Sequence, residues 1–143
     1  MNCEIPPYGG DFTIHGLTPS PAVVRAIRGE HGRQFADAFF GTEFKLSPQS
    51  DRMGIRLEGG DPGRRPGTGP VSGAVAPGTV QMPPDGQPIV LMADAQTIGG
   101  YAQAAQVASI DLPVLAQLRP GECVRFKEIS LEEAQSLLLA ACQ

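Results

Sequence analysis

Residues 78–101 of this chain read GTVQMPPDGQPIVLMADAQTIGGY, with one turn at the centre and a Gly-Gly pair near the end. The central turn, residues 83–86, separates a strand predicted around Val80 and Met82 from an apolar run at residues 89–93. A run of four or five apolar residues between turn signals is typical of a strand buried on both faces. The segment therefore predicts a β-hairpin whose returning strand is fully buried.

Polar side chains stand at both ends of this predicted strand. Gln81 and Gln87 flank the Pro-Pro-Asp-Gly turn, and Asp94 and Gln96 lead into the Gly-Gly pair at residues 99–100. Burying an amide or a carboxylate costs free energy unless the group forms hydrogen bonds. We therefore expect the functional site in this segment.

The composition predicts one mainly β domain. A chain of 143 residues can form one domain with a core, and its 18 glycines and 14 prolines indicate many turns between short strands. Residues 1–21 are expected to form an irregular arm, and residues 22–143 the domain.

Periodic patterns predict seven or eight short strands and two or three short helices, which suits a mainly antiparallel β-barrel capped by helices. The predicted strands include residues 23–28, 43–46, 53–58, 80–82, 89–93 and 123–126, and the predicted helices include residues 35–40 and 111–118. Asp111 is expected to be the N-cap of the second helix. Ser130 and Glu133 predict a capping box for a C-terminal helix. The side chains of that helix expected to face inward are Leu131, Ala134, Leu137 and Leu138.

Charge and cysteine usage exclude several classes of protein. The formal net charge is −4 and the isoelectric point is about 5.1, which gives no basic surface for nucleic acid or an anionic membrane. No segment has the roughly 18 apolar residues of a membrane span. The cysteines, Cys3, Cys123 and Cys142, have no metal-binding spacing. They are expected to be reduced thiols of a cytoplasmic protein, with Cys123 buried as a small apolar residue.

Four segments of the chain resemble the second carboxyltransferase subunit family, which includes allophanate hydrolase subunit 2, the C subunit of 5-oxoprolinase and the carboxyltransferase domain of urea amidolyase. The segments are residues 47–59 (SPQSDRMGIRLEG), 78–101, 111–118 (DLPVLAQL) and 119–126 (RPGECVRF). Only the C-terminal half of a family protein is resembled. The resemblance implies a cyclophilin-like antiparallel β-barrel capped by two or three short helices.

The same resemblance implies a function that depends on a partner. Family members work with a paired first subunit on ureido or lactam substrates: one branch transfers a carboxyl group from biotin to urea, and another opens 5-oxoproline with ATP hydrolysis. This chain has no Met-Lys-Met biotin-attachment sequence. Biotin or ATP is therefore expected to be supplied through the partner complex, and the chain alone is expected to be inactive.

The amide-rich segment supplies the candidate substrate site. Amide side chains match the N–H and C=O edges of ureido and lactam groups, and a guanidinium can hold a carboxylate with two hydrogen bonds. A buried aspartate can act as a base. The expected site consists of Asp94 as the catalytic group, with Arg52, Gln81, Gln96, Gly99, Gly100 and Tyr101 binding the substrate.

We expect Arg52, Gln81, Asp94 and Gln96 to converge in one pocket at the edge of the barrel, near Gly99 and Gly100. The alternative is that these side chains only stabilise turns and that Arg52 pairs with Asp51 or Glu58. The resemblance to the family favours the ligand site.

Two positions depart from the pattern of the family. Ile98 stands where a second threonine is common, and Ala102 stands where a proline commonly follows Gly-Gly-Tyr. If the hydroxyl of that threonine contacts substrate, the activity of this chain is in doubt, and loss of the proline would loosen the turn after Tyr101.

A second function, from a different class, is also open. The chain would be a non-catalytic binding module that docks a partner barrel, as in the sensor-kinase regulator pairs of this family. The glycine-rich loop at residues 59–73 suits a docking role as well as the role of a flap.

Overall fold

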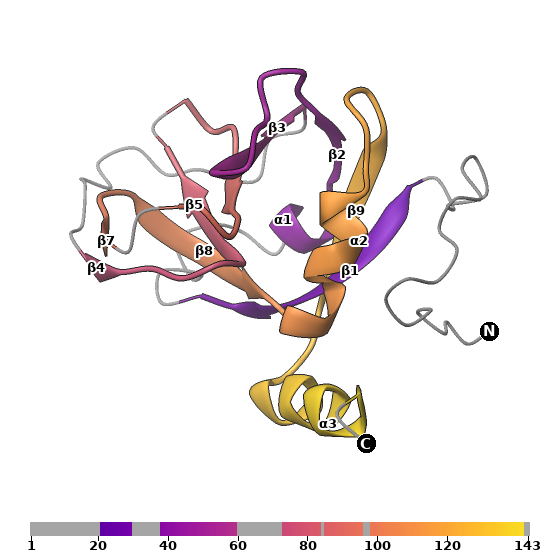
Figure 1. Ribbon diagram of the computed structural model, residues 1–143. Coiled ribbons are helices and arrows are strands. Elements are labelled where there is room, and N and C mark those ends of the chain that lie inside the picture. Colours follow the sequence, from indigo (N-terminus) through magenta and orange to yellow (C-terminus); the bar gives the residue numbers. More distant parts are fainter. Residues whose placement is uncertain (1–20, 30–37, 60–72, 84, 96–97, 142–143) are drawn as a thin grey trace.

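A computed structural model describes residues 21–29, 38–59, 73–83, 85–95 and 98–141. Within these residues, seven strands close a barrel in the order β1-β8-β5-β6-β3-β2-β9 (Figure 1). The barrel strands are β1 (Ala22–Arg28), β2 (Glu43–Leu46), β3 (Gly54–Glu58), β5 (Thr79–Met82), β6 (Ile89–Leu91), β8 (Ala102–Val107) and β9 (Cys123–Glu128). Neighbouring strands are antiparallel except β1 and β9. The expected mainly antiparallel barrel is confirmed.

Short elements cover the barrel. The strands β4 (Gly73–Ala74) and β7 (Ile98–Gly99) form a separate two-stranded sheet beside β8, on the left of Figure 1. The helices are α1 (Ala38–Gly41), η2 (Ser109–Asp111), α2 (Leu112–Ala116) and α3 (Leu131–Ala141). In the described part of the chain, no helix is long and apolar enough to cross a membrane. The expected arm, residues 1–21, lies almost entirely outside the described residues.

Alternate side chains of the strands fill the barrel interior with aliphatic residues, and three phenylalanines pack together beside them. Phe39 of α1 stacks on Phe126 of β9 with ring centroids 5.2 Å apart, and it lies 5.7 Å from Phe44 of β2. All three rings are buried, as expected for core anchors. Of the predicted helix at residues 35–40, the part before Ala38 lies outside the described residues.

The predicted hairpin is present, but its fully buried strand is β5 and not the returning strand β6. The Gly86 N–H donates to the carbonyl of Pro83 at 3.0 Å, and Gln81 of β5 pairs with Ile89 of β6. The prediction that residues 89–93 form a strand buried on both faces is wrong, because β6 ends at Leu91 and only its Val90 is fully buried. Instead all four residues of β5 are buried. The β4–β7 sheet covers the outer face of β5, whereas the outer face of β6 faces a cavity.

Asp111 is the N-cap residue of α2, as predicted, but its side chain makes no capping hydrogen bond. Its carboxylate instead accepts hydrogen bonds from the backbone N–H and the guanidinium of Arg25, at 2.7–2.9 Å. Asp111 is only 1% exposed. The pair joins β1 to the start of α2 with charge-assisted hydrogen bonds, which take the place of a bond to the helix.

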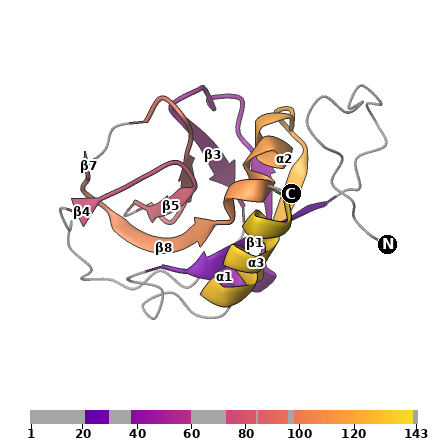
Figure 2. The same cartoon turned by 60° about the horizontal axis from the view of Figure 1, so that its bottom comes forward.

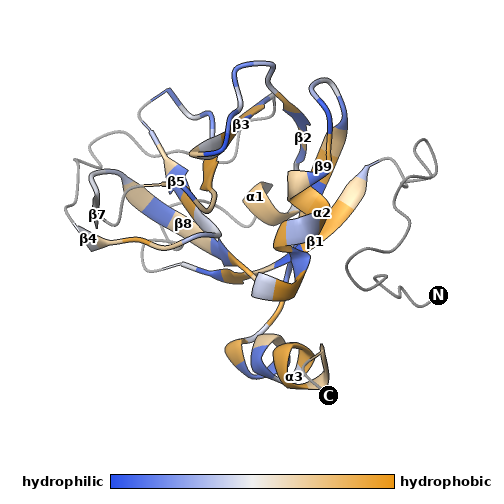
Figure 3. Ribbon diagram, in the orientation of Figure 1, coloured by the Kyte–Doolittle hydropathy of each residue, from blue (hydrophilic) through white to orange (hydrophobic). Residues whose placement is uncertain are grey.

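The C-terminal helix begins as predicted but packs differently. Ser130 and Glu133 form the reciprocal capping box, each donating its backbone N–H to the other's side chain at 3.0 Å. The predicted inward face is present only in part: Ala134 and Leu137 are half-buried, whereas Leu131 and Leu138 are exposed and no residue of α3 is fully buried. Within the described residues, α3 packs mainly on η2 and β1. It projects from the barrel (Figures 1 and 2). Its apolar residues are visible on the projecting helix in Figure 3.

The capping box predicts a local change in stability. We expect Ser130→Ala to destabilise α3 by about 1 kcal/mol, because one backbone N–H at the helix start loses its acceptor. Ser136→Ala is the matched control in the exposed middle of the same helix, where alanine favours the helix slightly. Amide hydrogen exchange of α3 measures both variants. Equal protection in the two variants would contradict a role for the capping box.

Candidate functional site

A cavity of about 260 Å³ lies on the outer wall of the barrel. Its floor is the outer face of three neighbouring strands, and its lining there includes Arg56 of β3, Ile89 and Leu91 of β6, and Gln81 of β5. Val75, Gly99, Gly100 and Tyr101 line it from the segments that carry β4 and β7. The inward residues of the same strands, Val80 and Val90, belong to the core.

The strand register places three floor residues in one row. Arg56 pairs with Ile89, and Ile89 pairs with Gln81 on its other side. Since neighbouring strands lie about 4.8 Å apart, the α-carbons of Arg56 and Gln81 are separated by roughly 10 Å. A guanidinium and an amide therefore stand on opposite sides of a half-buried aliphatic side chain.

Gln81 differs from the other glutamines on the outer face of the barrel. Gln103 donates its side-chain N–H to the carbonyl of Ala74 at 3.1 Å, and Gln106 donates to the carbonyl of Pro77 at 2.9 Å. These two amides fasten residues 74–77 to β8. Gln81 is 7% exposed, and within the described residues its side chain takes part in no hydrogen bond. A buried amide without a partner costs about 1–3 kcal/mol, so this group is suited to binding a ligand.

Gly99 fits against Gln81 because it has no side chain. A Cβ at Gly99 would overlap the Gln81 amide and would lie 2.9 Å from Cγ1 of Val75. A Cβ at the neighbouring Gly100 would meet nothing within 4 Å. The first glycine is therefore required by packing on Gln81, and the second borders open space.

This difference predicts opposite results for two alanine substitutions. We expect Gly99→Ala to destabilise the protein by about 1–3 kcal/mol, because the buried Gln81 and the half-buried Val75 side chains must move. Gly100→Ala is expected to change stability by less than about 0.5 kcal/mol. The free energy of unfolding in urea measures both. Equal effects would show that β7 does not pack on Gln81 in solution.

Arg52 and Asp94 form an ion pair with each other on the surface. Nε of Arg52 lies 3.4 Å from Oδ2 of Asp94, and their side chains are 91% and 54% exposed. Neither lines the cavity, although Asp51, Met53 and Ala95 beside them do. The burial that would let Asp94 act as a base is therefore absent. The alternative pairing of Arg52 with Asp51 or Glu58 is wrong.

The structure brings together four of the seven predicted site residues: Gln81, Gly99, Gly100 and Tyr101 all line the cavity. Gln96 lies outside the described residues. The roles of Asp94 as a catalytic group and of Arg52 as a substrate-binding group stay predictions, without a contact to the cavity. Gln87, the other glutamine beside the turn, binds a distant backbone group: its Oε1 accepts the N–H of Gly59 at 3.1 Å.

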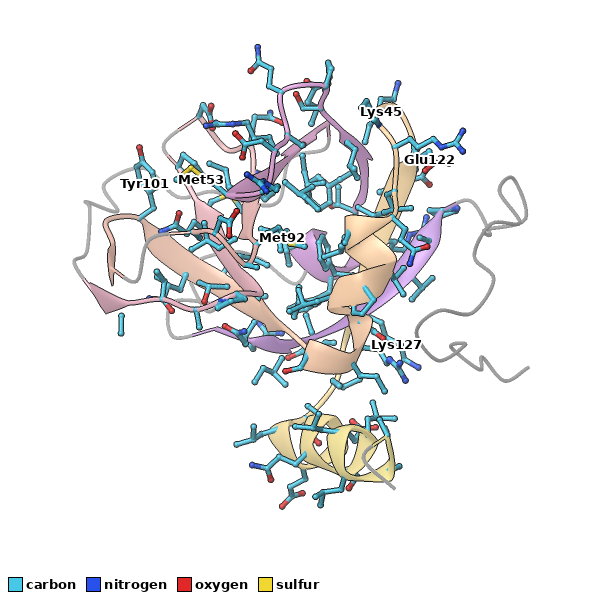
Figure 4. The ribbon with its side chains drawn as sticks, viewed as in Figure 1. Lys45, Met53, Met92, Tyr101, Glu122 and Lys127 are labelled. Carbon is cyan, nitrogen blue, oxygen red and sulfur yellow. The ribbon has the colours of Figure 1, made fainter. Side chains whose placement is uncertain are left out.

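Sequence reasoning missed Arg56. Its alternation with Ile55 and Leu57 places it on the outer face of β3, but the sequence does not say which strand lies beside β3 there. Two half-exposed side chains, Met53 and Tyr101, stand at the rim of the same cavity and are labelled in Figure 4. The sequence pattern predicts a strand that begins at Met53, whereas β3 begins at Gly54.

Metal binding and thiol chemistry find no support in the described residues. Among them, no three His, Cys, Asp or Glu side chains gather as a metal site would need. Cys123 is partly exposed, which corrects its predicted burial. A hydrogen bond to Glu43, with some burial, raises the pKa of its thiol. A raised pKa leaves little thiolate at neutral pH, so Cys123 is a poor nucleophile.

Comparison with known proteins finds a matching family model and relatives that are longer than this chain. The family model described as "Carboxyltransferase domain, subdomain A and B" matches residues 13–128. The chain is 41% identical over 128 residues to the C subunit of 5-oxoprolinase from Haemophilus influenzae, and 44% identical over 115 residues to the Escherichia coli protein of the same name. These alignments include 85% and 78% of this chain but 41% and 37% of those proteins. The chain thus spans about two fifths of the length of these relatives.

A solved structure contains the same fold. Part of Kluyveromyces lactis urea carboxylase superposes on this chain with a TM-score of 0.75 at 24% identity. The superposition includes 84% of this chain and 12% of that one. At this identity the likeness supports the fold alone.

Proposed function

Because the chain belongs to the family of carboxyltransferase domains with subdomains A and B, we propose that it is the C-terminal part of a second subunit that acts on a ureido or lactam substrate. The proposal includes a first-subunit homologue as partner. Similarity to two proteins named as the C subunit of 5-oxoprolinase favours the lactam branch over the urea branch. The cytoplasm is the proposed location, in line with the reduced thiols expected from the sequence.

The observation that carries this proposal is the buried amide of Gln81 in the outer-wall cavity. A primary amide offers both N–H donors and a C=O acceptor, which is the complement of the adjacent C=O and N–H of a lactam or a urea. Ile89 and Leu91 provide an apolar floor for the carbon atoms of a small ring. Binding would orient the substrate amide bond against the barrel wall, with one face open toward the rim at Tyr101.

The residues around this cavity do not suit a nucleotide or biotin. Its volume of about 260 Å³ lies below the range of roughly 300–1,000 Å³ typical of pockets for drug-sized ligands. Among the described residues, the lining contains a single arginine and no lysine. We therefore propose that ATP or biotin is supplied through the partner complex. In this proposal the chain binds and orients the substrate and is inactive alone.

Reconstitution tests this function. The purified chain is incubated with 5-oxoproline and ATP, with and without a first-subunit homologue, and phosphate and glutamate are measured. We expect both products only when the partner is present. Turnover by the chain alone would contradict the proposed dependence on a partner. Carboxylation of urea by carboxybiotin, without reaction of 5-oxoproline, would assign the chain to the other branch.

A non-catalytic binding module is the second candidate function, and the projecting helix α3 favours it. Leu131, Leu138 and Leu139 are exposed on this helix. Exposed apolar side chains suit contact with a partner subunit, and the relatives are themselves named as subunits. Co-purification with the first-subunit homologue separates the two functions. Binding that is lost in Leu138→Ser/Leu139→Ser, in a protein that binds no lactam, supports the module. Lactam binding that is lost in Gln81→Leu supports the enzyme part.

A further inference from the structure

The side chain of Arg56 lines the cavity and has no partner within the described residues. The hydrogen bonds at this residue use its backbone: the N–H donates to Oγ of Ser50 at 2.9 Å, and the carbonyl accepts the N–H of Ser47 at 2.8 Å. Four other described arginines are paired with carboxylates: Arg25 with Asp111, Arg28 with Glu128, Arg52 with Asp94 and Arg125 with Glu43. Arg119 has no such pair in the described part of the chain either, but it does not line the cavity. Arg56 thus brings a positive charge to the cavity that no carboxylate in this part of the chain neutralises by contact.

The nearest acidic group of the lining is held by the backbone. One oxygen of Asp51, Oδ1, accepts the N–H groups of Met53 at 2.8 Å and of Gly54 at 3.2 Å. These bonds close the turn before β3. They hold one oxygen of Asp51 in the turn, and among the described residues no ion pair joins its carboxylate to Arg56, so the guanidinium is available to an anion from outside.

We infer that Arg56 binds a carboxylate of the ligand and thereby selects a carboxylated lactam over an uncharged ureido compound. This inference rests on the proposed lactam or ureido function of the cavity. It assigns to Arg56 the carboxylate-binding role that the sequence alone suggested for Arg52.

The row Arg56–Ile89–Gln81 matches the shape of such a ligand. In 5-oxoproline the carboxylate and the lactam carbonyl are attached on opposite sides of the ring nitrogen. With the ring over Ile89, one side of the ligand faces the guanidinium and the other faces the amide. Guanidinium and carboxylate form two parallel hydrogen bonds, a geometry that lysine does not offer. Urea has no carboxylate, so it would form no such pair with Arg56.

Binding of two small lactams to four forms of the chain tests the inference. The ligands are 5-oxoproline and 2-pyrrolidinone, the same ring without the carboxylate, and the proteins are wild type, Arg56→Met, Arg52→Met and Arg119→Met. Arg119 is exposed and does not line the cavity, so Arg119→Met controls for net charge and is expected to change binding of neither ligand. Arg52→Met tests the competing assignment of the carboxylate to Arg52. Titrations followed by the side-chain amide signals of Gln81 in ¹H–¹⁵N spectra give the affinities. The same spectra report whether each variant is folded.

We expect Arg56→Met to weaken binding of 5-oxoproline about tenfold or more and to leave binding of 2-pyrrolidinone unchanged. Arg52→Met is expected to change neither. Unaltered 5-oxoproline binding by Arg56→Met, or an equal loss for both ligands, would overturn the role of Arg56 while leaving the lactam site in place. A loss seen with Arg52→Met instead would return the role to Arg52. If wild type binds neither ligand, the proposed lactam function fails and the inference fails with it.

Discussion

Gln81→Leu is expected to weaken binding of 5-oxoproline ten- to hundredfold, or about 1.5–3 kcal/mol, while the barrel becomes no less stable. Leucine has nearly the same size as glutamine and leaves no cavity. The amide that it replaces is buried and has no hydrogen-bond partner within the described residues. Removing such a group relieves a cost to folding and removes a contact to the ligand. Isothermal titration calorimetry and urea unfolding measure the two effects on the same sample.

Gln106→Leu is the matched control for this substitution. Gln106 also lies on the outer face of the barrel, but its amide donates to the carbonyl of Pro77 at 2.9 Å and accepts the hydroxyl of Thr79 at 2.8 Å. We expect this variant to lose about 1–3 kcal/mol of stability, because both partners lose a hydrogen bond. If Gln81→Leu destabilises the protein as much as Gln106→Leu, the amide of Gln81 has a structural role and the ligand site is refuted.

Asp111→Ala is expected to have the largest effect on stability, a loss of about 3–5 kcal/mol. The carboxylate accepts the backbone N–H, Nε and Nη2 of Arg25, at 2.7, 2.9 and 2.7 Å, and it is 1% exposed. Its removal leaves a mostly buried guanidinium without the charge that balances it in the barrel wall. Urea unfolding measures the loss.

Glu128→Ala serves as the control for Asp111→Ala. Glu128 pairs with Arg28 at 2.9 Å, also from β1, but both side chains are substantially exposed. Exposed pairs contribute about 0–1 kcal/mol, so this variant is expected to stay within that range. Similar losses of stability in the two variants would contradict the larger contribution expected of the buried pair Arg25–Asp111.

Local features of the fold were predictable from the sequence. The turn at residues 83–86 and the capping box at Ser130 both depend on residues within a few positions of one another. Asp111 shows the limit of such reasoning. Its position before a helix predicts a cap, but its partner Arg25 is 86 residues away.

Predicting the site required the order of the strands in the barrel, which local sequence patterns do not reveal. Hairpin pairing placed Gln81 opposite the returning strand, but nothing local showed that β3 would lie on the far side of β6 or that β7 would cover β5. For this reason the sequence pointed to Arg52, in a polar turn, and missed Arg56 in a strand. The leucines of α3 show the same limit. Their spacing predicts that one face of the helix is apolar, but it does not predict which surface packs on that face.

A crystal structure of the chain grown with 5-oxoproline is the sharpest test of the outer-wall cavity as the substrate site. We expect the ring over Ile89, the lactam group within hydrogen-bond distance of the Gln81 amide, and Gly99 against the back of that amide. A ligand bound elsewhere on the chain, with the Gln81 amide hydrogen-bonded to protein atoms, would contradict the assignment of the substrate site to this cavity.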